Sequence, residues 1–209
     1  MLGIDERSRE VLSFIPGVTL NRVPWPQWVW HDALLKQAAE ALAAYHLAVA
    51  DFRPITVESR LGSDLLDDGE IVCHNDFAPY NCAFRNGQLT GVLDWDVVCA
   101  GRSAWDVAFF AWHWVPLHAP SPGLEWRTVP ECPRRLCLAA DTNGLDDTTQ
   151  LVDLVIERIE TSRRGILERS AQGDAAFMRL EEGGHAEEMR RTLEFIADIG
   201  PSLRAALRR

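Results

Sequence analysis

Positive charge is scarce in this sequence of 209 residues. Its 21 lysines and arginines are outnumbered by 31 aspartates and glutamates, so the net charge is −10 at pH 7. A surface of this sign repels phosphate backbones and anionic headgroups, which disfavours nucleic-acid and anionic-membrane partners. It suits a polycationic small molecule, but many acidic proteins bind no such ligand.

Long apolar runs and paired cysteines are also lacking. No run is long enough to span a bilayer, and the first residues lack the basic and apolar segments of a signal peptide. The five cysteines are odd in number and include no C-x-x-C pair. This usage argues against a disulfide framework or a zinc site. We therefore expect a cytoplasmic protein of one domain, or of one domain plus a fragment, with reduced and buried thiols.

The most informative stretch runs from Ile71 to Asp96. Asn86 and Gly87 separate two runs of alternating polarity, which predicts a β-hairpin with a two-residue turn. In that register position 85 faces 88, 84 faces 89, 82 faces 91 and 81 faces 92. Side chains alternate along a strand, so two faces are expected. The buried face would hold Cys82, Phe84, Leu89 and Leu93, and the other Asn81, Arg85, Gln88, Thr90 and Asp94.

This register makes Asn81 and Asp94 diagonal neighbours on one face of the hairpin. A carboxylate and an amide oxygen so placed can hold Mg²⁺, which prefers oxygen ligands. Asp76 lies in the preceding loop, where a second carboxylate can face the same cleft. A base and a Mg²⁺ site are the parts that phosphoryl transfer needs.

These residues resemble a known family. His74-Asn75-Asp76, Asn81 and Leu93-Asp94-Trp95-Asp96 are similar to the catalytic and metal-binding loops of the aminoglycoside phosphotransferases, which share the protein-kinase fold. The segment VCHNDFAPYN looks closest to a bacterial subgroup described as trifolitoxin-immunity-like. The resemblance implies that Asp76 is the catalytic base and that Asn81 and Asp94 bind Mg²⁺. It also implies ATP as the phosphoryl donor, with GTP left open, and a structural role for His74.

Three further assignments rest on the same resemblance. Gly101 to Asp106 is similar to a Gly-Asp-Pro-x-x-Asp motif whose last residue anchors the catalytic loop, which is Asp106 here; Arg102 and Ser103 replace the family's Asp and Pro. Asp96 is a candidate auxiliary acid, or a solvated loop residue. A nucleotide-binding hinge is expected around Ser13, Phe14 and Ile15, where an ordinary edge strand is an equal alternative.

The expected fold is α+β, a mostly helical kinase-like large lobe built around the catalytic hairpin. Residues 1–30 would be a remnant of the small lobe with at most two strands, 2–4 and 10–15. Residues 31–209 would form the large lobe, with its catalytic loop at 74–81 and its metal loop at 94–96. Helices are predicted at 32–50, 104–114, 131–142, 147–171 and 184–207. For His46, His113 and His118 themselves, a structural role is favoured over metal binding.

The small lobe of such enzymes covers the phosphates with a loop and a cation, usually lysine. Lys36 is the sole lysine and follows the expected hinge, and Gly3 is the only glycine before Gly17. We therefore expect most of the small lobe to be missing. Apolar surface near Val11, Phe14 and Trp25 would then be exposed and would suit a homodimer.

Three functions remain open at this point. The first is a phosphotransferase that acts on a hydroxyl of a small molecule, aminoglycoside-like or other, with its competence in doubt. The second is a pseudokinase that serves as a binding or immunity protein. The third is a metal-dependent hydrolase that uses His74, Asp76 and Asp94. The sequence does not identify the acceptor.

Overall fold

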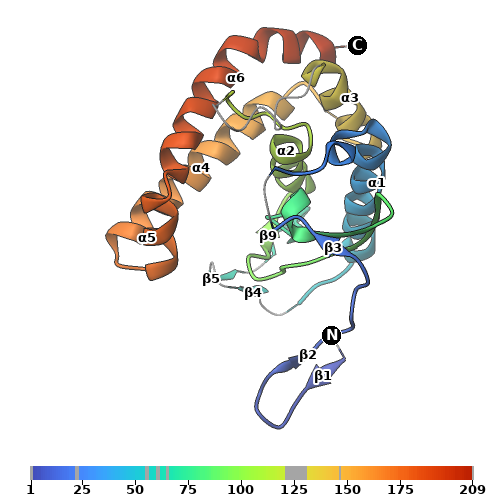
Figure 1. The fold of residues 1–209 in the computed structure, drawn as a ribbon, viewed down its shortest axis with the longest axis vertical. Coiled ribbons are helices and arrows are strands. Elements are labelled where there is room, and N and C mark those ends of the chain that lie inside the picture. Colours follow the sequence, from blue (N-terminus) through green and yellow to red (C-terminus); the bar gives the residue numbers. More distant parts are fainter. Residues whose placement is uncertain are drawn as a thin grey trace.

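The computed structural model describes residues 2–21, 24–54, 57–59, 62–64, 66–120, 131–145 and 147–208. Its body is a group of helices with short strands on one side, and a small N-terminal hairpin projects away from it (Figure 1). The fold is thus a mixture of helices and strands, as predicted. Within the described residues, no helix combines the length and the apolar character that crossing a bilayer requires.

Three short strands precede the first helix, one more than expected. β1 (Gly3–Ile4) pairs with β2 (Glu10–Val11), whereas β3 (Val18–Thr19) pairs antiparallel with β7 (Cys82–Arg85). The predicted strand over 10–15 is therefore wrong beyond Val11. After Val11 the chain leaves the β1–β2 hairpin and passes beside β8 (Gln88–Val92). The carbonyl of Pro16 accepts a hydrogen bond from the Thr90 hydroxyl at this point.

The predicted catalytic hairpin is present as β7 and β8, with Asn86 and Gly87 at its turn, both at positive φ. It forms a three-stranded sheet with β3. A second ladder joins β6 (Ile71–Cys73) antiparallel to β9 (Cys99–Gly101), and a third joins β4 (Val57–Ser59) to β5 (Gly62–Asp64). The β6–β9 ladder places the start of the catalytic loop beside the segment that leads into α2.

Four of the five predicted helices begin and end within one residue of their expected bounds, whereas α4 begins four residues late. They are α1 (Asp32–Val49), α2 (Ser103–Trp114), α3 (Cys132–Thr142), α4 (Leu151–Ala171) and α6 (His185–Leu207). A sixth helix, α5 (Ala175–Glu182), was not predicted, and Asp174 caps it by accepting a hydrogen bond from the Ala176 N–H. Two short 3₁₀ segments, Gln27–Trp30 and Pro79–Asn81, complete the described elements.

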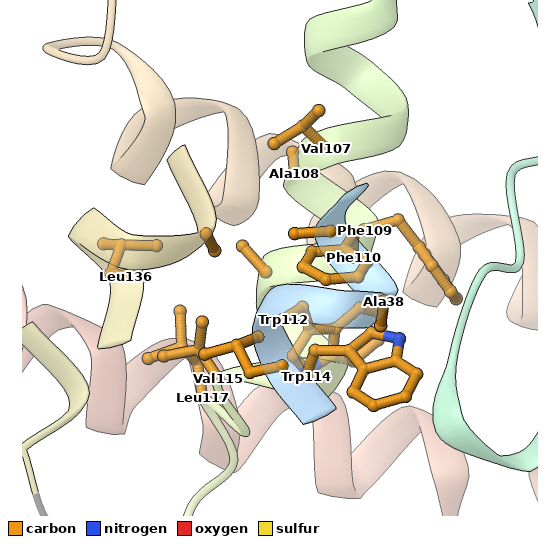
Figure 2. Packing of buried hydrophobic residues seen from close by; sticks show 14 of the residues in the cluster. Ala38, Val107, Ala108, Phe109, Phe110, Trp112, Trp114, Val115, Leu117 and Leu136 are labelled. Atoms are coloured by element: carbon orange, nitrogen blue, oxygen red, sulfur yellow. The ribbon is translucent and has the colours of Figure 1, made fainter. Parts of the chain in front are cut away.

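Helix α2 lies in the centre of the core. Its residues from Val107 to Trp112 are all buried, as is Trp114, so it packs on every side rather than along one stripe. Figure 2 shows side chains of α2 in one cluster with Ala38 of α1 and Leu136 of α3. Val29 and Trp30 are buried in the same core. The segment before α1 is therefore packed against the helical body.

A buried arginine on α3 bonds three other elements. The guanidinium of Arg135 on α3 pairs with Asp32 at the start of α1, at 2.5 Å. It also donates to the carbonyls of Trp30, at 2.8 Å, and Trp114, at 3.0 Å. These bonds satisfy two carbonyl groups at element ends that would otherwise be buried without partners.

Candidate active site

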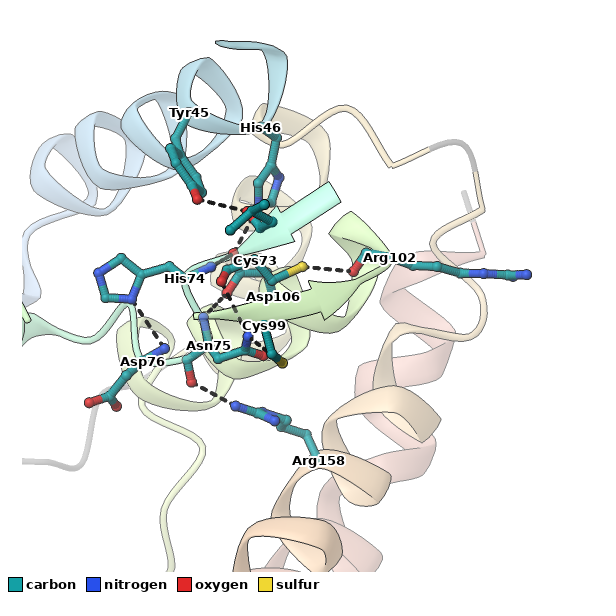
Figure 3. A network of polar contacts seen from close by, with 11 residues as sticks. Tyr45, His46, Cys73, His74, Asn75, Asp76, Cys99, Arg102, Asp106 and Arg158 are labelled. Atoms are coloured by element: carbon teal, nitrogen blue, oxygen red, sulfur yellow. Dashed lines mark hydrogen bonds and ion pairs between the residues drawn. The ribbon is translucent and has the colours of Figure 1, made fainter. Parts of the chain in front are cut away.

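The loop after β6 begins with two residues whose backbone is held by one carboxylate. Asp106, fully buried on α2, accepts the N–H of His74 at Oδ2 and the N–H of Asn75 at Oδ1, each at 2.9 Å. These bonds fix the loop relative to α2, and Asn75 adopts a positive φ of 63° there. Figure 3 shows this network.

His46 on α1 is the third partner of Asp106, and no local sequence pattern links the two residues. Its Nε2 lies 3.0 Å from Oδ2 of Asp106. Burial alone would raise the pKa of Asp106, but the hydrogen bond and charge of His46, with the backbone bonds of His74 and Asn75, outweigh it. The pKa of Asp106 is therefore held below its ordinary value, and the group stays ionised.

His74 links the catalytic loop to the segment that carries Asp94. Its Nδ1 accepts the N–H of Asp76 at 3.2 Å, so its Nε2 carries the proton and donates to the carbonyl of Leu93, also at 3.2 Å. Its ring lies 4.4 Å from that of Trp95. Burial lowers the pKa of His74, so the neutral ring that this bonding pattern needs is favoured.

Asp76 itself is held by two side chains from the turn that follows it. The hydroxyl of Tyr80 donates to Oδ1 at 2.8 Å, and the amide of Asn81 donates to Oδ2 at 2.6 Å. Burial raises the pKa of Asp76 to about 6; the hydrogen bonds from Tyr80 and Asn81 lower it and the charge of Asp94 raises it. A carboxyl group with such a pKa is mostly ionised near neutral pH and still has a useful affinity for a proton.

The register predicted for the hairpin is correct at its turn and wrong at its base. Arg85 faces Gln88 and Phe84 faces Leu89, but a bulge then shifts the pairing, so that Cys82 faces Val92 rather than position 91. Thr90 is the extra residue. Its hydroxyl bonds the carbonyls of Ala83 and Pro16, and Gly91 allows a close approach of Ile15, which would lie 2.7 Å from an added Cβ.

This bulge removes the geometry from which the Asn81–Asp94 pair was first deduced. Strand β8 ends at Val92, the Leu93 N–H donates to the carbonyl of Asn81 at 2.8 Å, and Asp94 adopts a positive φ of 60°. Alternation therefore does not set the direction of Asp94. Its charge nevertheless acts on both His74 and Asp76, and Asn81 bonds Asp76 directly. Asn81 is thus in contact with Asp76, and the role of Asp94 as a metal ligand stays a prediction.

The donor set of this group fits Mg²⁺ better than a transition metal. The amide nitrogen of Asn81 is bound to Asp76, which leaves its oxygen available to a cation, and the carboxylate of Asp94 is exposed. Oxygen ligands of this kind, with water completing the shell, are typical of Mg²⁺. Among the described residues, no group of three or more histidine, cysteine or acidic side chains could hold a metal ion.

The remaining predicted residues are Asp96 and the segment from Ser13 to Ile15. Asp96 is exposed, two residues beyond Asp94. Ser13 and Phe14 are exposed, Phe14 by 87%, and Ile15 packs against Gly91. The proposed hinge and auxiliary roles of these residues stay predictions.

Arg158 on α4 is a member of the site that sequence reasoning missed. Its Nη2 donates to the carbonyl of Asn75 at 2.6 Å, and its guanidinium lies 5.0 Å from the ring of Trp105 and 4.9 Å from that of Phe109. Its positive charge lowers the pKa of Asp76. The sequence offers no sign of this because 82 residues separate Arg158 from Asp76.

A cavity of about 820 Å³ opens beside Asp76, Asn75 and Tyr80. We call it the aromatic cavity, because α2, α5 and the segment before α1 contribute rings to it. The rings are those of Trp25, Trp30, Tyr80, Phe109, Trp112 and Phe177. Its volume is that of a typical site for a small molecule.

Comparison with known proteins agrees with this arrangement. Residues 51–136, which include the catalytic loop, the hairpin and α2, match the model of the phosphotransferase enzyme family. The chain is similar to phosphotransferases. The predicted resemblance is thereby confirmed.

One curated relative adds detail. The trifolitoxin immunity protein of Rhizobium leguminosarum bv. trifolii is 31% identical over 113 residues, which are 53% of this chain and 41% of that protein. The chain therefore spans less than half the length of that relative.

The solved structures resemble this chain in fold. One is a crystal structure of a protein described as an aminoglycoside phosphotransferase from Ralstonia eutropha JMP134, with a TM-score of 0.53 and 17% identity over 88% of this chain and 71% of that one. The other is the macrolide 2′-phosphotransferase of Brachybacterium faecium, with a TM-score of 0.50 and 18% identity over 93% and 68%. The fold is therefore that of kinase-like phosphotransferases.

Proposed function

We propose that this protein transfers the γ-phosphoryl group of ATP to a hydroxyl group of a small molecule, with Asp76 as the general base. The observation that carries the proposal is the position of Asp76. It combines a pKa of about 6 with hydrogen bonds from Tyr80 and Asn81, and it lines the aromatic cavity. A base near neutral pKa beside a substrate-sized cavity is what proton abstraction from a hydroxyl needs.

In the proposed reaction the acceptor oxygen forms a bond to the γ-phosphorus while the bond to the bridging oxygen breaks and ADP leaves. The proton of the acceptor hydroxyl moves to Asp76. Asn81 and Asp94 would hold Mg²⁺, which neutralises phosphate charge when it is bound. Asn81 has a second task, because its amide orients the Asp76 carboxylate.

Three residues would position the base without touching the substrate. Asp106 holds the backbone of the loop, and His46 keeps Asp106 ionised. His74 donates to the carbonyl before Asp94 and accepts the N–H of Asp76, so it couples the base to the proposed metal ligand. A change in any of the three should therefore disturb both the proposed base, Asp76, and the proposed metal ligand, Asp94.

The test is a transfer assay with Mg·ATP or Mg·GTP, in which ³¹P NMR follows phosphorylated products of kanamycin, erythromycin and 2-naphthalenemethanol. Asp76→Asn should lower turnover by about 10²–10⁴ and leave nucleotide affinity nearly intact. Asp94→Ala should instead abolish Mg²⁺-dependent nucleotide binding. Asp68→Asn, an exposed acid before β6, is the matched control and should behave as wild type. Equal and mild losses from the first two substitutions would reject these roles.

A second candidate is a binding or immunity protein that does not turn over nucleotide. It is favoured by the similarity to the trifolitoxin immunity protein. It is also favoured by the position of Lys36, which forms an exposed ion pair with Glu40 on α1, 3.2 Å apart, and so is engaged away from Asp76. Phosphates need cations or N–H donors facing their oxygens.

Calorimetric titration of the 209-residue polypeptide with Mg·ATP separates the two candidates. The second candidate predicts weak binding, with Kd near or above the millimolar range, because no clamp would then face the phosphates. Micromolar binding would contradict the second candidate and favour the enzyme. Binding of an acceptor-like ligand without nucleotide turnover would favour the second candidate.

A further inference from the structure

The aromatic cavity differs in character from the molecular surface. The surface belongs to a chain of net charge −10, which on its own would suit a polycationic ligand. The cavity is instead lined by aromatic rings and by the aliphatic side chains of Ile166, Leu180 and Met189. Such walls bind a ligand by burial of its apolar surface and by contact with ring faces.

The rings form a connected wall beside the base. Trp25 stacks on Trp30 with centroids 5.6 Å apart and lies 6.4 Å from Tyr80, whose hydroxyl bonds Asp76. Tyr80 in turn meets the ring of His113 edge-on at 5.7 Å. An acceptor whose hydroxyl reaches Asp76 must therefore pass along or lie against these rings.

The charges in the cavity are balanced rather than acidic. Among the described residues that line it, the carboxylates are Asp76 and Glu188, and the guanidinium groups are those of Arg158 and Arg169. Glu188 already lies 3.9 Å from Nδ1 of His118. A polycation would thus meet two positive groups as well as two carboxylates, so these groups offer it no net electrostatic attraction.

The two arginines are held in place by the walls. Arg158 lies over the rings of Trp105 and Phe109, and Arg169 lies 4.9 Å from the centre of the Phe177 ring. Cation–π contacts of this kind keep the positive charge at the cavity wall. A second cation brought by a ligand would compete for the same ring faces and be repelled by the guanidinium groups.

We infer that the acceptor is a largely apolar alcohol or phenol without net positive charge, and not a polycationic amino sugar. This inference rests on the proposed function, because it takes the aromatic cavity as the acceptor site. The ring walls supply most of the affinity, and the two arginines exclude cationic analogues. The hydroxyl of the ligand would replace or share the bond that Tyr80 makes to Asp76.

The test is calorimetric titration without nucleotide, with two ligands that differ in one group. 2-Naphthalenemethanol is neutral, and 2-naphthalenemethanamine is a cation at pH 7 with the same ring system. We expect the alcohol to bind at least about tenfold more tightly than the amine. Kanamycin, which carries several ammonium groups, should give no saturable binding at millimolar concentration.

Two variants on neighbouring helices locate the effect. Arg169→Glu places a negative charge on the cavity wall and should reduce or reverse the preference for the alcohol. Arg179→Glu makes the same change at an exposed position of α5 that does not line the cavity, and should leave the preference unchanged. Phe177→Ala should weaken binding of both naphthalene ligands by a similar factor, since it removes wall area from each. Circular dichroism checks that each variant is folded.

The inference is overturned if the amine or kanamycin binds as tightly as the alcohol, if no naphthalene ligand binds, or if Arg179→Glu acts like Arg169→Glu. Transfer of phosphate to kanamycin in the assay above would reject the inference and support the proposed function. Tight binding of the alcohol with no transfer to any acceptor would reject the proposed function and leave the ligand class standing.

Discussion

Replacing Tyr80 by phenylalanine removes one hydrogen bond to the proposed base and keeps the aromatic wall. The hydroxyl donates to Oδ1 of Asp76 at 2.8 Å and lowers its pKa, which burial has raised to about 6. Loss of the donor should therefore raise the pKa further. A hydrogen bond to a charged acceptor contributes about 1.5–3 kcal/mol, but water can replace part of it because Tyr80 is 37% exposed.

We expect a shift of about half to one pH unit in Tyr80→Phe. At pH 7 the base would then fall from roughly nine-tenths ionised to about half to three-quarters ionised. The acidic limb of kcat/KM against pH should move upward by the same amount, while the rate at high pH changes little. A ¹³C NMR titration of the Asp76 carboxyl group gives the pKa directly, even in the absence of turnover.

Tyr45→Phe is the matched control, since Tyr80 and Tyr45 are the two tyrosines of the chain. The Tyr45 hydroxyl donates to the carbonyl of Val72 at 2.7 Å, and so does not bond Asp76. The control should leave the pKa of Asp76 unchanged. An unchanged or lowered pKa in Tyr80→Phe would refute the assignment of this hydrogen bond and, with it, the account of how the base is tuned.

Three further predictions concern the stability of the fold and its assembly. Because the folded-state pKa of Asp76 is raised, ionisation of this group costs stability as the pH rises from about 4 to 6. Asp76→Asn should therefore raise Tm at pH 8 by a few degrees and leave it unchanged at pH 4. A lower Tm at pH 8 would contradict this. Asp106→Asn should destabilise the fold by about 3–5 kcal/mol in urea unfolding, since it removes the buried charge that pairs with His46; a loss under about 1 kcal/mol would argue against the anchor. Sedimentation should detect a homodimer that Phe14→Asp and Leu2→Asp disrupt together, because both side chains are largely exposed; a wild-type monomer at all concentrations would exclude it.

The local part of the site could be predicted from sequence because it is encoded in short spacings. Asn86-Gly87 specifies its hairpin through the positive φ that both residues tolerate, and the helices follow from the spacing of apolar residues such as Leu34, Leu35 and Ala38. The loop that carries Asp76 and Asn81 spans six residues, so their contact needs no knowledge of the tertiary fold.

The rest of the site depends on contacts between distant segments. His46 reaches Asp106 across 60 positions, and Arg158 reaches Asn75 across 83. Neither residue belongs to a local pattern, and a histidine or arginine on a helix is more often exposed. The short α5 was missed for a related reason, since it spans only eight residues and none of them is buried.

The bulge at Thr90 shows most clearly where alternation stops being a guide. Strict pairing from the turn requires every residue of β8 to face one residue of β7, yet Thr90 faces none, because its hydroxyl is engaged with Ala83 and with Pro16 of the crossing segment. That segment precedes the hairpin by some 70 residues, so the cause of the bulge lies outside any local window. What then places Asp94 is a chain of bonds rather than a strand register. Asn81 binds Leu93 through its backbone, His74 binds the carbonyl of Leu93, and Asp94 follows directly. The proposed metal ligand is thus positioned by the loop at 74–81. We therefore predict that His74→Phe weakens Mg²⁺-dependent nucleotide binding as well as turnover. A defect in turnover alone would show that Asp94 is held by other contacts.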